Sequence, residues 1–255
     1  GDIDLETARE KVKKYFGDIP AGPPLAKPDI WIAKRSEENR DIMYDNVPQA
    51  RIYKAWNVPP RDTEAAAHFD LASSVLVGGK NSPLFKELVY EKQIATSVSA
   101  FYYDREIAGM FIIVVDVVAG QDPKMVEKEM DTVLQTFTQK GPNKKLLEAE
   151  KTKTLASFIR GAQRIGGFGG KSDLLATCQT YTGNPGCYIN NARYIDESTP
   201  AKIKSTFIKW IDDTPYVLSI LPSEKLATNK STIDRSEGIP YPTEKISFKF
   251  PSLQT

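Results

Sequence analysis

The stretch from Gly78 to Ala100 most constrains what this chain can fold into, because it predicts three elements and the turns between them. The pair Gly78–Gly79 can adopt positive φ angles and is expected to end a helix, and Ser82 with Pro83 can begin the next one. From Ile94 onward the residues are typical of a strand. The junction therefore predicts a fold in which helices and strands lie close together along the chain.

Periodicity extends this prediction to the rest of the sequence. Apolar residues recur at helical spacing in eight segments: 5–16, 64–77, 82–92, 123–140, 143–162, 172–181, 187–194 and 200–210. Five segments are typical of strands: 41–46, 50–58, 94–103, 108–118 and 216–221. The short loop 104–107 suits an antiparallel hairpin. We expect an α+β fold in which helices cover one face of an antiparallel sheet.

Charge and hydropathy exclude two classes of partner. Lys and Arg number 34 against 33 Asp and Glu, and no basic stripe is present to drive binding to nucleic acid. The longest apolar run, Met110 to Val115, is far shorter than the roughly 20 residues that span a bilayer. We therefore expect neither a nucleic-acid partner nor a membrane span.

Two isolated features resemble catalytic motifs without completing them. His68 is the single histidine, and Ala72 stands where a second histidine would complete a zinc-binding helix face, so we interpret His68 as a packing or surface residue. Gly170-Lys171-Ser172 resembles the end of a phosphate loop. That motif requires glycine where Ile165 stands, and it follows a strand, whereas a helix precedes this loop.

The remaining reactive residues do not form a catalytic set. Paired carboxylates lie in charged helical runs that are typical of solvated faces, and no serine lies in a nucleophile elbow. Cys178 and Cys187 can pair across a short loop in an oxidising compartment or remain free, and the sequence leaves both alternatives open. Two cysteines and one histidine do not make a convincing zinc site. We predict no catalytic and no metal-binding residue.

Several motifs, in order, resemble one family. They are Gly17-Asp18-Ile19-Pro20, the junction 78–95, and Ser157 to Arg160 leading into the glycine-rich loop 165–171. Together they resemble the inactive, non-zinc-binding domain of the insulinase/pitrilysin/mitochondrial processing peptidase family of zinc metallopeptidases. The resemblance covers nearly the whole chain, and it implies a LuxS/MPP-like metallohydrolase fold.

The resemblance also implies a division of the chain. In this family a His-x-x-Glu-His helix and a distant Glu hold zinc, and none of these is present here. Residues 1–43 are expected to be the end of a preceding zinc-bearing domain plus a linker, 44–222 the inactive peptidase-like domain, and 223–255 an exit linker to a second half. The fragment itself is expected to hold no cofactor, and the parent protein to hold zinc.

Substrate contact is also implied only by the resemblance. Many members grip the substrate with an Arg and a Tyr seven residues apart, and those positions fall here at Val89 and Thr96. Both functional side chains are therefore missing. The remaining candidates lie at the glycine turn, on the following strand and in the glycine-rich loop: Gly78, Gly79, Lys80, Phe101, Gly167 and Phe168.

The function implied is that of a non-catalytic, chamber-forming and substrate-contacting domain of a larger bacterial zinc metalloendopeptidase, located in the periplasm. The alternative is a structural core-protein-like subunit without peptidase activity. A third hypothesis is a peptide-binding module that uses an open sheet edge, at strand 50–58 or 95–103.

Overall fold

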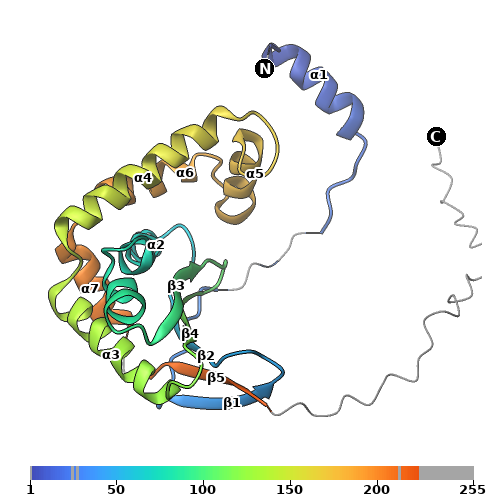
Figure 1. Cartoon of the computed structure of the whole chain (residues 1–255). Coiled ribbons are helices and arrows are strands. Elements are labelled where there is room, and N and C mark those ends of the chain that lie inside the picture. Colours follow the sequence, from blue (N-terminus) through green and yellow to red (C-terminus); the bar gives the residue numbers. More distant parts are fainter. Residues whose placement is uncertain (1, 24–25, 27–28, 212–213, 224–255) are drawn as a thin grey trace, which may run out of the picture.

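The structure is a computed structural model that describes residues 2–23, 26, 29–211 and 214–223 of the 255-residue chain. The predicted exit linker falls, from residue 224 onward, outside this part. The described residues form a sheet with helices packed on one side, and α1 lies apart from this body at the end of the N-terminal segment (Figure 1). None of the described helices is long and apolar enough to cross a membrane.

The sheet has five strands in the order β1-β5-β2-β4-β3. Their bounds are Asn39–Asp45 for β1, Arg51–Val58 for β2, Ala95–Tyr103 for β3, Gly109–Val117 for β4 and Tyr216–Pro222 for β5. β2 pairs antiparallel with both β4 and β5, and β3 pairs antiparallel with β4. β1 runs parallel to β5, so the sheet is mixed, and the mostly antiparallel arrangement agrees with the predicted α+β class.

Seven α-helices and one π-helix complete the described elements. They are α1 (Leu5–Phe16), α2 (Glu64–Val77), η1 (Phe85–Glu91), α3 (Pro123–Lys140), α4 (Lys144–Gln163), α5 (Lys171–Thr182), α6 (Cys187–Asp196) and α7 (Pro200–Trp210). Thr63 and Asp122 begin α2 and α3 by accepting backbone hydrogen bonds from Ala66 and Lys124, which is the role expected of these cap residues. The eight predicted helical segments are thus all present.

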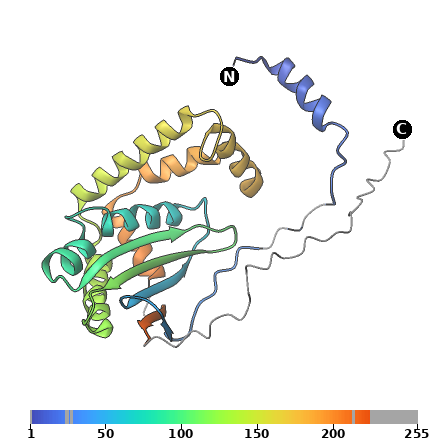
Figure 2. The same cartoon turned by 45° about the vertical axis from the view of Figure 1, so that its right-hand side comes forward.

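The core lies between the sheet and the helices of the body, and all of these helices lie on one side of the sheet (Figure 2). Strict alternation along β4 turns Phe111, Ile113 and Val115 into this core. Phe111 packs against Phe207 of α7 with ring centroids 5.4 Å apart. An aromatic cluster therefore joins the sheet to the helical layer.

The structure differs from the sequence-based expectation at three places. Gly78 has a φ of −70°, because its amide continues the helical hydrogen bonding to the Ser74 carbonyl, so α2 does not end in a left-handed glycine. The helix expected at 82–92 is a π-helix from Phe85 to Glu91. The strand at 50–58 is not an open edge, because β5 and β4 flank it on both sides.

The domain boundary expected between residues 43 and 44 falls inside β1, which pairs with β5 along its whole length. The sheet itself therefore begins at Asn39, before the expected boundary.

Candidate functional site

The strands present one face that no described helix covers. Along β2 the side chains of Tyr53, Ala55 and Asn57 alternate with buried residues and point to this side. On β4 the corresponding residues are Ile112 and Val114, which lie opposite Ala55 and Tyr53. We call this surface the open face. Most of these side chains are apolar, and all five are half-buried.

β3 forms one edge of the sheet, beside the open face. It pairs only with β4, so its outer backbone groups have no strand partner among the described elements. Phe101, which is 40% exposed, and Tyr103 point to the open face, and the Arg105 guanidinium stacks over the Tyr103 ring at 3.7 Å. An extended peptide can add to such an edge by backbone hydrogen bonds.

An acidic cavity of about 360 Å³ lies behind the hairpin that joins β3 and β4. Partial burial raises the pKa of Asp62 and that of Asp70, and the charge of Asp104 adds to both shifts. Arg61 forms an ion pair with Asp104 and also stacks over the Tyr181 ring at 4.3 Å. The cavity wall includes the disulfide between Cys178 and Cys187, which links α5 to α6.

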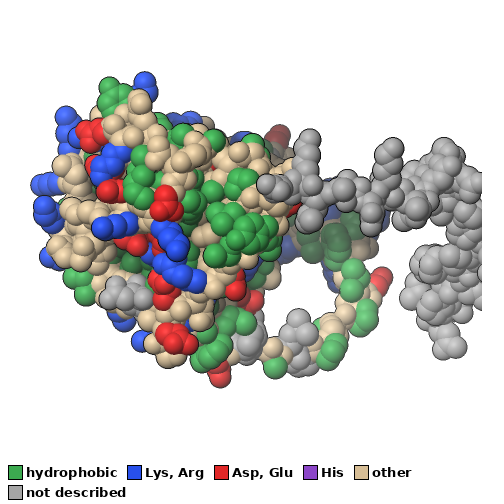
Figure 3. Space-filling view, turned by 60° about the horizontal axis from the view of Figure 1, so that its bottom comes forward, with side chains coloured by type: hydrophobic (Ala, Val, Ile, Leu, Met, Phe, Trp, Pro, Cys, Tyr) green, Lys and Arg blue, Asp and Glu red, His purple; other side chains and the backbone are tan. Residues whose placement is uncertain are grey.

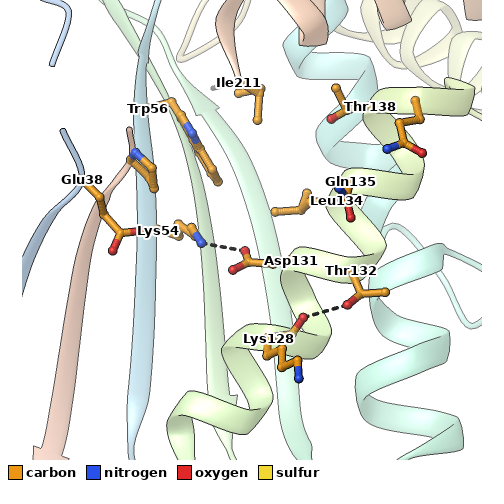
Figure 4. A pocket seen from close by; sticks show the side chains of 12 residues that line it. Glu38, Lys54, Trp56, Lys128, Asp131, Thr132, Leu134, Gln135, Thr138 and Ile211 are labelled. Atoms are coloured by element: carbon orange, nitrogen blue, oxygen red, sulfur yellow. Dashed lines mark hydrogen bonds and ion pairs between the residues drawn. The ribbon is translucent and has the colours of Figure 1, made fainter. Parts of the chain in front are cut away.

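A second cavity, of about 500 Å³, opens beside α3 (Figure 4). Lys54 points from β2 toward α3, where its Nζ lies 2.6 Å from Asp131 Oδ1 and 3.3 Å from Glu127 Oε1. Arg40 of β1 donates two hydrogen bonds to the Glu127 carboxylate, of 2.7 Å to Oε1 and 2.8 Å to Oε2. Four charged groups thus connect β1 and β2 to α3.

The two carboxylates of this cluster differ in their pKa. Burial alone would raise the pKa of Glu127, but the Arg40 hydrogen bonds and the Lys54 charge outweigh it and hold this pKa below its usual value. Burial raises the pKa of Asp131, and Lys54 offsets only part of that rise. We interpret the cluster as a structural ion-pair network. Lys54 is only 5% exposed, and both of its carboxylate partners lie on α3.

His68 is buried between α2 and α7. Its Nδ1 lies 2.6 Å from Thr206 Oγ1, and its Nε2 has no hydrogen-bond partner among the described residues. Burial lowers the pKa of His68, and Glu64, with Oε1 3.9 Å from Nε2, offsets this only in part. Within the described ranges, no group of three His, Cys, Asp or Glu residues could hold a metal ion.

The structure does not gather the six predicted contact residues into one place. Gly78, Gly79 and Lys80 follow α2 and lie beside Glu150, in the first half of α4. Gly167 and Phe168 follow the far end of α4, about 20 Å further along its axis. Phe168 is 97% exposed, and Gly167 has a φ of +79°, which favours glycine.

Sequence reasoning missed the Lys54 cluster, although a signal for it exists. Lys54 stands between Ile52 and Trp56 in the inward register of a half-buried strand. A lysine at such a position needs a buried counter-charge, which the charged run on α3 contains. The sequence also left the cysteines unassigned, and the structure joins them in a disulfide across nine residues.

Comparison with known proteins identifies the family. The model of the peptidase M16 inactive domain matches residues 1–154, which is more than half of the chain. The chain belongs to the peptidase M16 inactive-domain family. A comparison with curated proteins gives no match.

Solved structures of this M16 inactive-domain fold agree with the chain at low sequence identity. The peptidase M16 inactive domain from Pseudomonas fluorescens has 19% identity and a TM-score of 0.71, with 88% of this chain and 52% of that one covered. An inactive peptidase domain from Bordetella parapertussis has 15% identity and a TM-score of 0.61, with 70% and 95% covered. The periplasmic protease PqqL from Escherichia coli has 13% identity and a TM-score of 0.67, with 88% and 25% covered. The M16 chain described here spans about half the length of the Pseudomonas protein.

Proposed function

We propose that this chain is the non-catalytic, chamber-forming and substrate-contacting domain of a larger zinc metalloendopeptidase. The observation that carries the proposal is an M16 inactive-domain fold in a sequence whose single histidine, His68, is buried between two helices. A His-x-x-Glu-His zinc helix needs two histidines, so the zinc and the general base belong to another domain. We place the whole protein in the bacterial periplasm, which suits the Cys178–Cys187 disulfide.

The test is a comparison of this chain with the whole protein. We expect the purified chain to bind no stoichiometric zinc and to cleave no unfolded peptide, whereas the whole protein does both. Elemental analysis of the purified protein and hydrolysis of a fluorogenic peptide library measure the two properties. Stoichiometric zinc on the chain alone contradicts the proposal.

The structural alternative, a core-protein-like subunit, differs in one respect. The zinc-bearing half would then lack an intact His-x-x-Glu-His segment, and the whole protein would cleave no peptide. Reading the sequence of that half, together with the cleavage assay, distinguishes the two functions.

The contact role of the glycine-rich loop has its own test. Phe168 is fully displayed on this loop, so Phe168→Ser should raise KM for peptide hydrolysis by the whole protein several-fold while changing the free energy of unfolding by less than about 0.5 kcal/mol. Ile165→Ser is the matched control, because Ile165 is also exposed on this loop but is not a predicted contact residue. An unchanged KM in Phe168→Ser removes this residue from the contact surface.

A peptide-binding module remains a second candidate, because β3 is an edge strand of the sheet. A bound peptide should then slow hydrogen exchange of amides in β3 and leave β2, which is fully paired, unchanged. Equal exchange in β3 with and without peptide rejects this candidate.

A further inference from the structure

The loop between α4 and α5, residues 164–170, is closed by hydrogen bonds of its own backbone. The Lys171 amide donates a hydrogen bond of 2.7 Å to the Arg164 carbonyl, and the Ser172 amide donates one of 3.2 Å to the Ile165 carbonyl. The loop lies at the end of α4 that points away from α3 (Figures 1 and 2). It therefore forms a closed projection at one end of the helical layer.

The tip of this loop displays one aromatic side chain. Phe168 is 97% exposed, whereas the rings of Phe111 and Phe207 are fully buried in the core. Gly167 and Gly169, on either side of Phe168, have φ angles of +79° and +69°, which other residues rarely adopt. These two glycines permit the tight turn that carries Phe168 away from the body.

The part of the chain around the loop is basic. Residues 154–195 contain one carboxylate, that of Asp173, and four cations: Arg160, Arg164, Lys171 and Arg193. The carboxylate accepts a hydrogen bond of 2.9 Å from the Gly169 amide. Four cations against one carboxylate give this segment a net charge of +3, in a chain whose net charge is +1. The rest of the chain is therefore slightly acidic.

Other parts of the surface mix the two signs of charge. Figure 3 views the molecule from the side of α3 and β1, and it shows acidic and basic side chains interspersed on that face. Around the loop, by contrast, the excess of cations accompanies exposed apolar side chains. Ile159 of α4 and Ile165 are 59% and 63% exposed. This combination is complementary to a partner that is both apolar and anionic.

We propose that the α4–α5 loop anchors the protein to the surface of an anionic lipid bilayer. Phe168 enters the boundary between headgroups and acyl chains, and Arg160, Arg164 and Lys171 contact the lipid phosphates. Aromatic rings bind at that depth, and clustered cations add attraction to anionic lipids. Arginine and lysine side chains can reach phosphates while their methylene groups stay in apolar surroundings.

The exposure of Phe168 also favours a bilayer over a peptide as its partner. Phe168 lines neither the acidic cavity nor the cavity beside α3, so the described residues offer it no groove that would hold an extended peptide. A broad surface can surround a projecting ring without such a groove. The proposal goes beyond the proposed function and does not depend on zinc or on peptidase activity.

Co-sedimentation of the whole protein with lipid vesicles tests the anchor. We expect binding to vesicles made of equal parts of phosphatidylglycerol and phosphatidylcholine, and much weaker binding to phosphatidylcholine alone. Added salt should weaken the binding, because it screens charges at the surface. Phe168→Ser should lower the binding constant about tenfold, because the ring no longer leaves water. Phe168→Trp, which keeps an aromatic ring, should bind as tightly as the natural protein.

The cations have their own variant. Arg160→Gln combined with Arg164→Gln should also lower the binding constant about tenfold. Two controls should leave binding unchanged. Tyr90→Ser removes an aromatic ring that is 67% exposed on η1, and Lys144→Gln with Lys145→Gln removes two exposed cations from the opposite end of α4.

Three results overturn the proposal. They are an absence of binding to the anionic vesicles, binding by Phe168→Ser that equals that of the natural protein, and equal losses in the control variants, which would indicate unspecific attraction. The contact of Phe168 with peptide is measured separately, through KM in the absence of vesicles. A failure of that contact role is therefore distinguishable from a failure of the anchor.

Discussion

At the scale of single residues, the ammonium of Lys54 is buried, and a buried charge costs free energy unless it is paired. Its charge is compensated by Glu127 and Asp131, which both come from α3. Lys54→Met keeps the length of the side chain but leaves Asp131 without its cation. We expect the free energy of unfolding to fall by about 3 kcal/mol. Urea denaturation at pH 7 measures it.

The control for this change is Lys128→Met, on the same helix and lining the same cavity. Lys128 is exposed, so its loss should change the free energy of unfolding by less than about 0.5 kcal/mol. Equal effects of the two changes would show that the cluster around Lys54 contributes nothing specific.

His68 predicts a pH dependence of stability. Burial lowers its pKa, and the groups that face it are Glu64 on its own helix and Lys202 and Thr206 on α7. The unfolded chain therefore binds the proton at a higher pH, near 6.5, than the folded one does. The stabilisation from neutral His68 is complete above that pH and is lost as the pH falls below it. Chemical denaturation between pH 7.5 and 5 should show a smaller fall in His68→Gln than in the natural chain.

At the scale of elements, the disulfide joins two helices that add little to the main core. Cys178 of α5 and Cys187 of α6 are among the few buried residues of these helices. A bridge that closes a loop of about ten residues contributes roughly 2–3 kcal/mol to the closed state. Changing both cysteines to serine should make residues 171–196 cleavable by trypsin at least tenfold faster.

Limited proteolysis with mass spectrometry measures this effect, and wild-type chain treated with a reductant should behave in the same way. Cleavage sites in α3 provide the internal control, because α3 packs on the main core through Val126 and Met130. Faster cleavage throughout the chain would mean that the bridge supports the whole body.

The elements could be predicted from sequence because their signals are local. Thr63 and Asp122 occupy cap positions, and alternation along β4 fixes its buried face. The strand neighbours could not be predicted in this way, since β2 looks like an edge strand until β5 is known to lie beside it. The φ angle of Gly78 could not be predicted either. Glycine can adopt φ angles of either sign, and the hydrogen bond from the Gly78 amide to the Ser74 carbonyl is known only from the structure.

At the scale of the whole molecule, family-like motifs predicted the fold, and the contact residues that they imply stay a prediction. The motif order from Gly17 to Lys171 identifies an inactive peptidase domain, and the match over residues 1–154 agrees. The six contact candidates came from the resemblance alone, and the structure distributes them over three separate places. Phe101 shows why their surroundings could not be predicted from the sequence. Only the pairing of β3 with β4 reveals that Phe101 lies in a broad apolar layer.

The position of β5 has a consequence for how the chain folds during synthesis. β5 is the last described strand, yet it lies between β1 and β2, which are made first. In the folded sheet these two strands do not pair with each other, so β1 acquires its partner among the described strands only after α7 has been synthesised. Such distant pairing is slow to form and leaves a nascent strand exposed. If synthesis stops before Tyr216, the β3–β4 hairpin and the helices should therefore still pack together. β1 would then lack its strand partner and could be bound by chaperones.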